Sequence, residues 1–321
     1  MRFFLGMAAV FLLATFAPPT MSRPEPPPAV TRLSFTPVPM EEAAPRRVAL
    51  GALHYLGGWH VRSNDHRFGG LSAMHVGARD VLALSDSGWL VRFPRPDLLP
   101  GPAVVELVQP AGPGAGSAKE SRDSESLAVH GPFAWIGYEK ANAVWRYRLK
   151  DWAPSGGAEP AAMEKWPSNG GSEAMLRLPD GRFLVFAEGR GGGALTEALL
   201  FSGDPASKGT RAEAVSYRPP TGYRLTDAAL LPDGRVLFLN RRFRLLEGFS
   251  VKLVAARLPR LREGAEIGGR EIAEFGGTSI EDNLEALSVT REEGRTIVWM
   301  ASDDNFNPLQ RSLLLKFELV G

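Results

Sequence analysis

The sequence predicts an all-β fold, a single β-propeller of four-stranded blades, from three observations. Segments of similar sequence recur at spacings of 54, 47, 54 and 58 residues, counted between Ser72, Ser126, Glu173, Asp227 and Glu285. The 321 residues include 35 glycines and 26 prolines, which indicates many turns between short elements. No amphipathic segment of roughly ten residues or more predicts a helix between the repeats. Four-stranded units at this period are typical of propellers.

Each repeat is predicted to open with a short apolar strand that turns back into a second strand. Asp-Gly turns are clearest at residues 178–182 and 231–235, and this dipeptide between apolar runs is a strong hairpin signal. The predicted first strands open at residues 69–74, 123–129, 170–175, 225–230 and 283–289. The predicted second strands are Val81–Leu84, Ala134–Gly137, Phe183–Phe186, Val236–Leu239 and Ile297–Met300.

The outer strands of each blade follow in chain order. Third strands are expected at Trp89–Phe93, Val144–Leu149, Leu195–Phe201, Val251–Leu258 and Ser312–Leu319. Fourth strands are expected at Val104–Val108, Ala162–Trp166, Ala212–Tyr217 and Arg270–Phe275.

The ring is expected to close through the N-terminal part of the chain. The last repeat has no fourth strand of its own, and Ala52–Gly58 resembles Ile272–Gly277. We expect Ala52–Gly58 to complete the C-terminal blade, and Leu33–Thr36 to add a further strand, which would remove exposed sheet edges. Five units are visible and a sixth, degenerate blade is left open. The alternative fold is a β-sandwich whose internal similarity is coincidental.

The first residues predict export. Met1-Arg2 precedes an apolar run from Phe3 to Ala17, shorter than the roughly 20 residues of a membrane span, and prolines follow it. We expect a signal peptide at 1–22, a Pro-rich lead-in at 23–47 and the propeller domain at 48–321. The expected location is periplasmic or secreted, with an uncleaved membrane anchor as the alternative and no stable span after cleavage.

Composition excludes several classes of function. The 37 basic and 36 acidic side chains give a net charge of +1, which argues against a nucleic-acid partner. The absence of cysteine excludes disulfides, zinc–thiolate sites and a thiol nucleophile. We expect a monomer that acts on a small anionic or ester substrate.

Acidic residues recur at the two strand ends that a hairpin brings to one mouth of the ring. The first strands start with Glu125, Glu173, Asp227 and Glu285, and the second strands end near Asp86, Glu139, Glu188, Asp303 and Asp304. Converging carboxylates repel one another unless a cation, basic partners or protons neutralise them. Oxygen ligands without cysteine favour Ca²⁺ or Mg²⁺. Ion pairing with Arg190, Arg241, Arg242 and Arg311 is the alternative that needs no metal.

Several motifs stand in an order that resembles the bacterial phytase-like family, described as "esterase-like activity of phytase", over about residues 50 to 319. These motifs are Gly69–Ser72, Ser85–Gly88, Glu125–Leu127, Asn169–Glu173, Asn283–Leu287, Ser302–Phe306 and Gln310–Leu314. The resemblance implies an exported phytase-like β-propeller and, from the family's name, hydrolysis of phosphoesters or esters. True β-propeller phytases are calcium enzymes with a Lys/Arg-rich phosphate site. This chain has few lysines, so only its arginines could fill that part, and phytate itself is not favoured.

The leading hypothesis is a divalent-cation-dependent phosphoester or ester hydrolase with its site at the acidic mouth. The expected metal ligands are Asp86, Glu125, Glu139, Glu188, Glu285, Asp303 and Asp304. The expected catalytic residues are Glu173 and Asp227 as carboxylates, with Arg241 and Arg311 holding an anionic group. Two alternatives are a metal-dependent lactonase and a non-catalytic propeller that binds a cell-envelope ligand.

Overall fold

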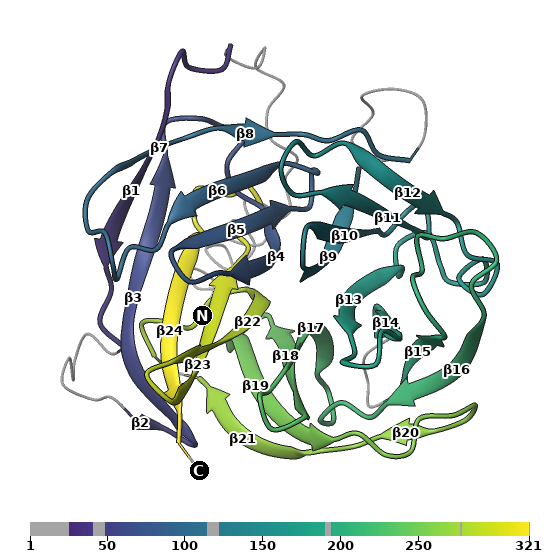
Figure 1. Ribbon diagram of the computed structural model, residues 1–321. Coiled ribbons are helices and arrows are strands. Elements are labelled where there is room, and N and C mark those ends of the chain that lie inside the picture. The colour runs from purple at the N-terminus through teal and green to yellow at the C-terminus, as the bar shows by residue number, and fades with distance from the viewer. Residues whose placement is uncertain (1–25, 41–48, 114–121, 190–193, 277, 321) are drawn as a thin grey trace, which may run out of the picture.

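The computed structural model shows five sheets arranged around a central axis (Figure 1). The structure describes residues 26–40, 49–113, 122–189, 194–276 and 278–320. The innermost strands are β4 (Leu71–Val76), β9 (Ser124–His130), β13 (Ser172–Arg177), β17 (Arg224–Leu230) and β22 (Leu284–Glu292). Each of them contacts the innermost strands of both neighbouring sheets, so the ring is closed. The predicted propeller is confirmed, and the described residues form five blades with no sixth between them.

Every predicted second and third strand is present. The second strands are β5 (Asp80–Ser85), β10 (Phe133–Tyr138), β14 (Phe183–Ala187), β18 (Arg235–Arg244) and β23 (Arg295–Ser302). The third strands are β6 (Leu90–Pro94), β11 (Ala143–Arg148), β15 (Thr196–Phe201), β19 (Gly248–Arg257) and β24 (Leu313–Leu319). Within the described residues no helix is long and apolar enough to cross a membrane.

The Asp-Gly turns form as the sequence predicts. Gly181 and Gly234 have φ angles of +91° and +84°, and each backbone N–H donates across its turn, to Leu178 and Leu231. Positive φ is accessible to glycine without a steric penalty, which explains why glycine occupies both turns.

The N-terminal part of the chain closes the ring, as predicted. β3 (Leu53–Ser63) pairs antiparallel with β24, from Leu319↔Leu53 to Leu313↔His60. β1 (Thr31–Pro37) pairs with β3 and includes the predicted strand Leu33–Thr36, so the propeller includes part of the segment 23–47. A short strand, β2 (Ala49–Leu50), pairs with the start of β3. The predicted signal peptide at 1–22 lies outside the described residues.

The fourth strands differ from the prediction in two blades. Val104–Val108 divides at the exposed Glu106 into β7 (Ala103–Val105), which pairs with β1, and β8 (Leu107–Val108), which pairs with β6. β16 (Ala212–Tyr217) and β21 (Arg270–Phe275) form as expected, and β20 (Glu266–Ile267) extends β16's sheet in parallel.

The predicted fourth strand Ala162–Trp166 is wrong. The edge strand of that blade is β12 (Pro154–Ala158), while the predicted segment forms turns that bury Met163 and Trp166 in the core. Proline is tolerated at the first position of an edge strand. Gly157 leaves room for the indole of Trp145, because a Cβ there would lie 2.8 Å from its Cε2 atom.

Apolar side chains fill the spaces between neighbouring sheets. Between the third and fourth blades, the rings of Tyr217 and Phe238 stack with centroids 4.0 Å apart, and Phe186 meets Phe238 edge to face at 5.6 Å. All three aromatic residues are fully buried. This packing holds the innermost strands, and therefore the residues at their ends, in fixed positions.

Candidate functional site

Each innermost strand begins with a β-bulge at the face where the second strand ends, and this face is called the mouth below. In β9, Ser124 pairs with Tyr138 and Ser126 pairs with Gly137, so Glu125 is left over between them. The equivalent extra residues of the five blades are Ser72, Glu125, Glu173, Thr226 and Glu285. A bulge releases one residue from the ladder and redirects its side chain. Three of these five positions hold a glutamate.

Asp227 is not equivalent to these glutamates, although the sequence repeats had suggested that it was. Thr226 occupies the bulge in β17, and Asp227 follows it. The Asp227 carboxylate accepts hydrogen bonds from the backbone N–H groups of Ala228 and Leu287, both at 2.7 Å. Burial raises the pKa of Asp227 well above its usual value, while those two hydrogen bonds lower it. The residue therefore joins β17 to β22 between two blades.

The three bulge glutamates influence one another. Burial raises the pKa of Glu125 well above its usual value, and the charges of Glu173 and Glu285 raise it further. Burial and the charge of Glu285 likewise raise the pKa of Glu173. Burial and mutual repulsion therefore favour the protonated form of these two carboxyl groups, and a bound cation would favour the ionised form.

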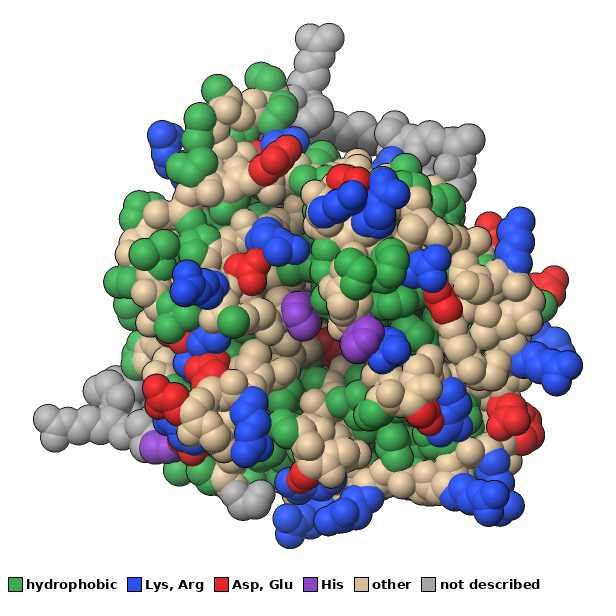
Figure 2. All heavy atoms as spheres, viewed as in Figure 1, with side chains coloured by type: hydrophobic (Ala, Val, Ile, Leu, Met, Phe, Trp, Pro, Cys, Tyr) green, Lys and Arg blue, Asp and Glu red, His purple; other side chains and the backbone are tan. Residues whose placement is uncertain are grey.

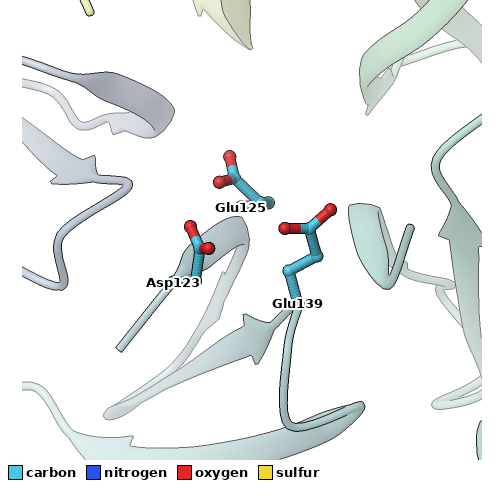
Figure 3. Close-up of side chains that lie close together, drawn as sticks. All are labelled: Asp123, Glu125 and Glu139. Atoms are coloured by element: carbon cyan, nitrogen blue, oxygen red, sulfur yellow. The ribbon is translucent and has the colours of Figure 1, made fainter. Parts of the chain in front are cut away.

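A group of three carboxylates lies in the second blade, at Asp123, Glu125 and Glu139 (Figure 3). One oxygen from each lies within 4.8 Å of the others, and the three side chains point toward a common space. Glu139 follows β10, and its N–H donates to the Asp123 carbonyl at 2.7 Å, which fixes the two segments together. Burial raises the pKa of Glu139 to about 7, with Asp123 and Glu188 adding to the rise and Lys140 opposing it.

Asp123 was not among the residues predicted for the site. It precedes the bulge by two positions, so it lies on the same side of the strand as Glu125. The spacing of Asp123 and Glu125 in the segment Asp-Ser-Glu-Ser could have indicated this position, because the two acids are two residues apart at the start of a strand. Lys140 forms an ion pair with Asp123, with Nζ and Oδ2 3.0 Å apart.

The fifth blade contributes Asp303 and Asn283 beside Glu285. Asp303 is 5% exposed, and burial, Glu285 and Asp86 together raise its pKa well above the usual range. Its Oδ1 accepts the Asn305 N–H at 2.6 Å, and Asn283 donates to its Oδ2 at 3.4 Å. Asn283 occupies the position equivalent to Asp123, two residues before the bulge.

One arginine faces these acids. Arg241 follows Asn240 in β18 and forms an ion pair with Glu285, with Nη1 and Oε1 2.7 Å apart. It also donates to the side-chain oxygen of Asn283. Burial opposes its charge, but Glu285 and Glu173 outweigh burial and raise the pKa of Arg241.

Asp86 and Glu188 lie at the ends of β5 and β14. A Cβ on Gly70, whose φ is +59°, would come within 2.5 Å of Asp86 Oδ1, so the glycine makes room for the carboxylate. The charge of Asp86 contributes to the raised pKa values of both Glu125 and Asp303. Glu188 pairs with Arg224 at 2.9 Å.

Two other predicted site residues form structural contacts. Both oxygens of Asp304 accept hydrogen bonds, Oδ1 from the N–H groups of Gly70 and Phe306 and Oδ2 from the Ser312 hydroxyl. Arg311 pairs with Asp282 at 3.0 Å and donates to the Ser279 carbonyl at 2.9 Å. Asp304 thus fixes the Gly69-Gly70 loop to the last blade, and Arg311 fixes the loop before β22.

The structure therefore divides the predicted residues. It gathers Asp86, Glu125, Glu139, Glu173, Glu188, Glu285, Asp303 and Arg241 at the mouth. It uses Asp227, Asp304 and Arg311 to join loops and blades, and it adds Asp123, Asn283 and Arg224 to the site.

Histidine side chains flank the hollow at the centre of the face shown in Figure 2, and an acidic side chain lies deeper within it. A cavity of about 330 Å³ lies between the first and second blades on the face opposite the mouth, where β4 and β9 end, and is lined by His75, His130 and Arg92. Burial lowers the pKa of His75, and the charge of Arg92 lowers it further against the opposing charge of Asp80. His60 lies elsewhere, in β3, where burial, Arg62 and Arg311 lower its pKa against the opposing charge of Asp304.

The site has the donor set of a hard cation. The group Asp123, Glu125 and Glu139 could hold a metal ion through oxygen atoms alone, which suits Ca²⁺ or Mg²⁺ better than a softer metal. The remaining acids and Arg241 surround it with groups that can hold a proton or an anion.

A family model described as "Phytase-like: Esterase-like activity of phytase" matches residues 66–306. The chain belongs to this phytase-like family. The match includes every bulge of the ring and all the acids gathered at the mouth. No curated protein matches the chain.

Solved structures with some similarity include three enzymes. Myxococcus xanthus glutaminyl cyclase is 11% identical with a TM-score of 0.48, covering 84% of this chain and 97% of that one. A structure named RS223-Beta-xylosidase is 12% identical with a TM-score of 0.45, covering 82% and 94%. Kuenenia stuttgartiensis hydrazine synthase is 12% identical with a TM-score of 0.39, covering 75% and 58%. At these values the similarities carry no information about this chain's activity.

Proposed function

We propose that this phytase-like propeller is an exported, divalent-cation-dependent hydrolase of phosphoesters or carboxylic esters, with its site at the mouth. The observation that carries the proposal is the set of three carboxylates at Asp123, Glu125 and Glu139, whose oxygens lie within 4.8 Å of one another. Family membership supports ester hydrolysis as the reaction class.

Asp123, Glu125 and Glu139 would hold the cation, with Ca²⁺ as the first candidate and Mg²⁺ as the second. A bound cation would supply positive charge to the substrate's oxygen and to an attacking water. The pKa of about 7 for Glu139 means that cation and proton compete for this carboxylate near neutral pH.

Glu173 is the proposed general base. Its pKa is raised by burial and by Glu285 and Glu188, against the opposing charge of Arg241. A carboxylate with a pKa shifted toward the working pH accepts a proton from water more readily than an ordinary one. Its bulge position holds it in the same ring of residues as Glu125.

Arg241 and Arg224 would orient an anionic group of the substrate. Both come from the fourth blade, while the three-carboxylate group belongs to the second, so the mouth has a basic side and an acidic side. Arg224 has a side chain 48% exposed and pairs with Glu188, which leaves part of its guanidinium open to solvent. Substrate charge would then be held between cation and arginine.

The test is turnover of p-nitrophenyl phosphate and p-nitrophenyl acetate by the purified protein, with Ca²⁺, with Mg²⁺ and with EDTA. We expect turnover of one of them with a cation, loss in EDTA, and a fall of about 100-fold in Glu173→Gln. Glu293→Gln is the matched control, because Glu293 is 86% exposed at the opposite face of the ring. Equal rates in Glu173→Gln and the control would reject the assigned base, and no turnover with either cation would reject the hydrolase.

A lactonase is the second candidate. The observation that favours it is that, in the part of the chain the structure describes, the only close group of metal-binding side chains is a single one of three carboxylates. A single cation fits a lactonase better than a phytase-like enzyme with several. Adding an aliphatic lactone to the same assay separates the two candidates, because only the lactonase would open it faster than it cleaves p-nitrophenyl phosphate.

Export is part of the proposal and has its own test. The apolar run from Phe3 to Ala17 after Met1-Arg2 supports a signal peptide. We expect a shortened protein in the periplasmic or secreted fraction of a bacterial host. Recovery of the full-length chain from the membrane fraction would instead support an uncleaved anchor.

A further inference from the structure

The hairpin of β18 and β19 extends beyond the other blades at the mouth. Asn240 in β18 pairs with Leu225, at the register position where the second strands β5, β10, β14 and β23 end. β18 continues past that point to Arg244, and its ladder with β19 runs out to the pair Arg244↔Gly248. The tip of the hairpin is therefore carried past the rim of the ring.

This tip exposes large apolar side chains. Leu246 is 91% exposed, Leu245 is 57% exposed and Phe243 is 44% exposed. The rings of Phe243 and Phe249 pack against each other with centroids 5.0 Å apart, which stiffens the base of the tip. Clustered exposed apolar side chains on a soluble protein mark an interaction surface, whereas single ones need no explanation.

A second apolar loop lies at the mouth of the neighbouring blade. The connection from β23 to β24 carries Phe306, 37% exposed, and Leu309, 58% exposed. The innermost strands of these two blades, β17 and β22, are in contact, so the two loops rise from adjacent parts of the rim. Two neighbouring loops at the mouth, in the fourth and fifth blades, therefore both carry exposed apolar side chains.

Basic side chains lie next to the leucines, on the part of β18 nearer the ring. Arg242 and Arg244 precede the tip, with side chains 22% and 55% exposed. The guanidinium of Arg242 lies 4.7 Å from the centre of the Tyr223 ring. Glu247 pairs with Arg244 at 3.0 Å and with Arg242 at 3.6 Å, so the two arginines share this acid as a partner. Another acid near the tip is Glu281, with its Oε1 atom 3.7 Å from the position of a Cβ on Gly248. On approach to a bilayer, the leucines at the tip would reach the acyl chains while the arginines nearer the ring stay at the level of the anionic head groups.

We propose that the β18–β19 tip docks on an anionic lipid surface, with Leu245 and Leu246 entering the acyl region and Arg242 and Arg244 meeting lipid phosphates. The tip projects beyond the rim of the ring, and an apolar projection suits insertion into a fluid medium. The proposal does not depend on the hydrolase activity, because none of these four residues belongs to the carboxylate group at Asp123, Glu125 and Glu139.

The test measures binding to vesicles by sedimentation, with EDTA present so that no cation bridges protein and lipid. The full chain and its variants are compared, all with the same N-terminus, on vesicles of phosphatidylcholine with and without phosphatidylglycerol. We expect Leu245→Ser combined with Leu246→Ser to lower the partition coefficient on anionic vesicles by about tenfold or more. We expect Arg242→Gln combined with Arg244→Gln to lower it on anionic vesicles but not on neutral ones.

Leu98 and Leu99 provide the matched control. They are 56% and 61% exposed and follow β6, which runs away from the mouth, so they lie toward the opposite face. Leu98→Ser combined with Leu99→Ser is expected to bind vesicles like the original protein. The proposal is overturned if the original protein does not bind anionic vesicles. It is also overturned if the Leu245/Leu246 and Leu98/Leu99 double variants lose vesicle binding equally, or if neither loses any.

A second measurement places the tip directly. Because the chain has seven tryptophans of its own, quenching is measured relative to the original protein. Lipids brominated in the acyl chains should quench additional fluorescence in Leu246→Trp and none in Leu99→Trp. Equal quenching in both variants would mean that the tip does not enter the bilayer. A tip that binds a protein partner instead would give crosslinks at residue 246 without any vesicle binding. Turnover of a soluble substrate stays unchanged in the leucine variants, which separates failure here from failure of the hydrolase proposal.

Discussion

Arg241 and Glu285 form an ion pair between the fourth and fifth blades, with Nη1 and Oε1 2.7 Å apart. Glu285 is the bulge residue of β22, and Arg241 lies in the extension of β18. The pair places one basic group against a set of acids that otherwise repel one another. It also distinguishes a side of the mouth where arginine pairs with Glu285 from the side at Asp123, Glu125 and Glu139, where three carboxylates that could hold a cation have Lys140 as a basic partner.

Removing the arginine should destabilise the protein. We expect Arg241→Met to lower the free energy of unfolding by about 2 kcal/mol, because Glu285 would be left partly buried without its partner. Thermal melts in EDTA measure this loss. Adding Glu285→Gln in the same chain should recover most of it, and a double variant no more stable than the single one would show that the pair does not carry the effect.

Stability without a cation should fall as the pH rises. Glu139 has a pKa of about 7 in the folded protein, above its ordinary value, so the folded state binds the proton more tightly than the unfolded state. Its contribution is fully present below about pH 4.5 and is lost by about pH 7, at most about 3 kcal/mol. Glu125, Glu173 and Asp303 shift in the same direction. Melts in EDTA between these pH values should show this fall, and Ca²⁺ should reverse it most strongly at the higher pH. A melting temperature that rises with pH in EDTA would contradict the account.

Asp227 should matter for folding and not for binding. Asp227→Ala removes the acceptor of two backbone N–H groups, at Ala228 and Leu287, so we expect a loss of about 2–4 kcal/mol in denaturant unfolding. The fraction that stays folded should bind Ca²⁺ with unchanged affinity. A weakened affinity in the folded variant would mean that Asp227 belongs to the site after all.

Replacing two glycines that have similar φ angles with alanine should separate the cost of backbone strain from the cost of side-chain crowding. Gly70 and Gly131 have φ angles of +59° and +55°, but a Cβ meets Asp86 Oδ1 and Phe306 Cε2, both at 2.5 Å, in the first case and open space in the second. We expect Gly131→Ala to cost about 1 kcal/mol and Gly70→Ala about 2–3 kcal/mol in denaturant unfolding. Equal costs would show that the side chains of Asp86 and Phe306 both move aside freely and are not held in place at this loop.

The sequence repeats made the fold predictable, except where a strand forms through pairing with its neighbour and not from its own sequence. Asp-Gly turns and apolar runs identified every second and third strand, and the similarity of Ala52–Gly58 to Ile272–Gly277 identified the strand that closes the ring. The edge strand Pro154–Ala158 was missed, because Pro-Ser-Gly-Gly-Ala has low strand propensity and forms a strand through its pairing with β11.

Most of the acids of the site were predictable from the sequence, but not which residue of each strand faces the mouth. The acids at strand ends were recognisable as a recurring pattern, and most of them do meet at the mouth. Which acid faces the mouth depends on the bulge, and a bulge is fixed by the partner strand rather than by the strand's own sequence. This is why the sequence repeats align Asp227 with Glu173 although Thr226 occupies the equivalent position in the structure. The same uncertainty concealed Asp123, two residues before its bulge.

The central claim is that the second blade binds a divalent cation, and calorimetric titration with Ca²⁺ tests it most directly. Three proteins are compared at neutral pH after treatment with EDTA and dialysis: the original chain, Asp123→Asn combined with Glu125→Gln, and the control Glu293→Gln. We predict saturable binding in the original chain and the control, and a loss of at least about tenfold in affinity in the double variant. Binding of equal affinity in all three proteins, or no binding in the original chain, would contradict the assignment of Asp123, Glu125 and Glu139 as the metal site.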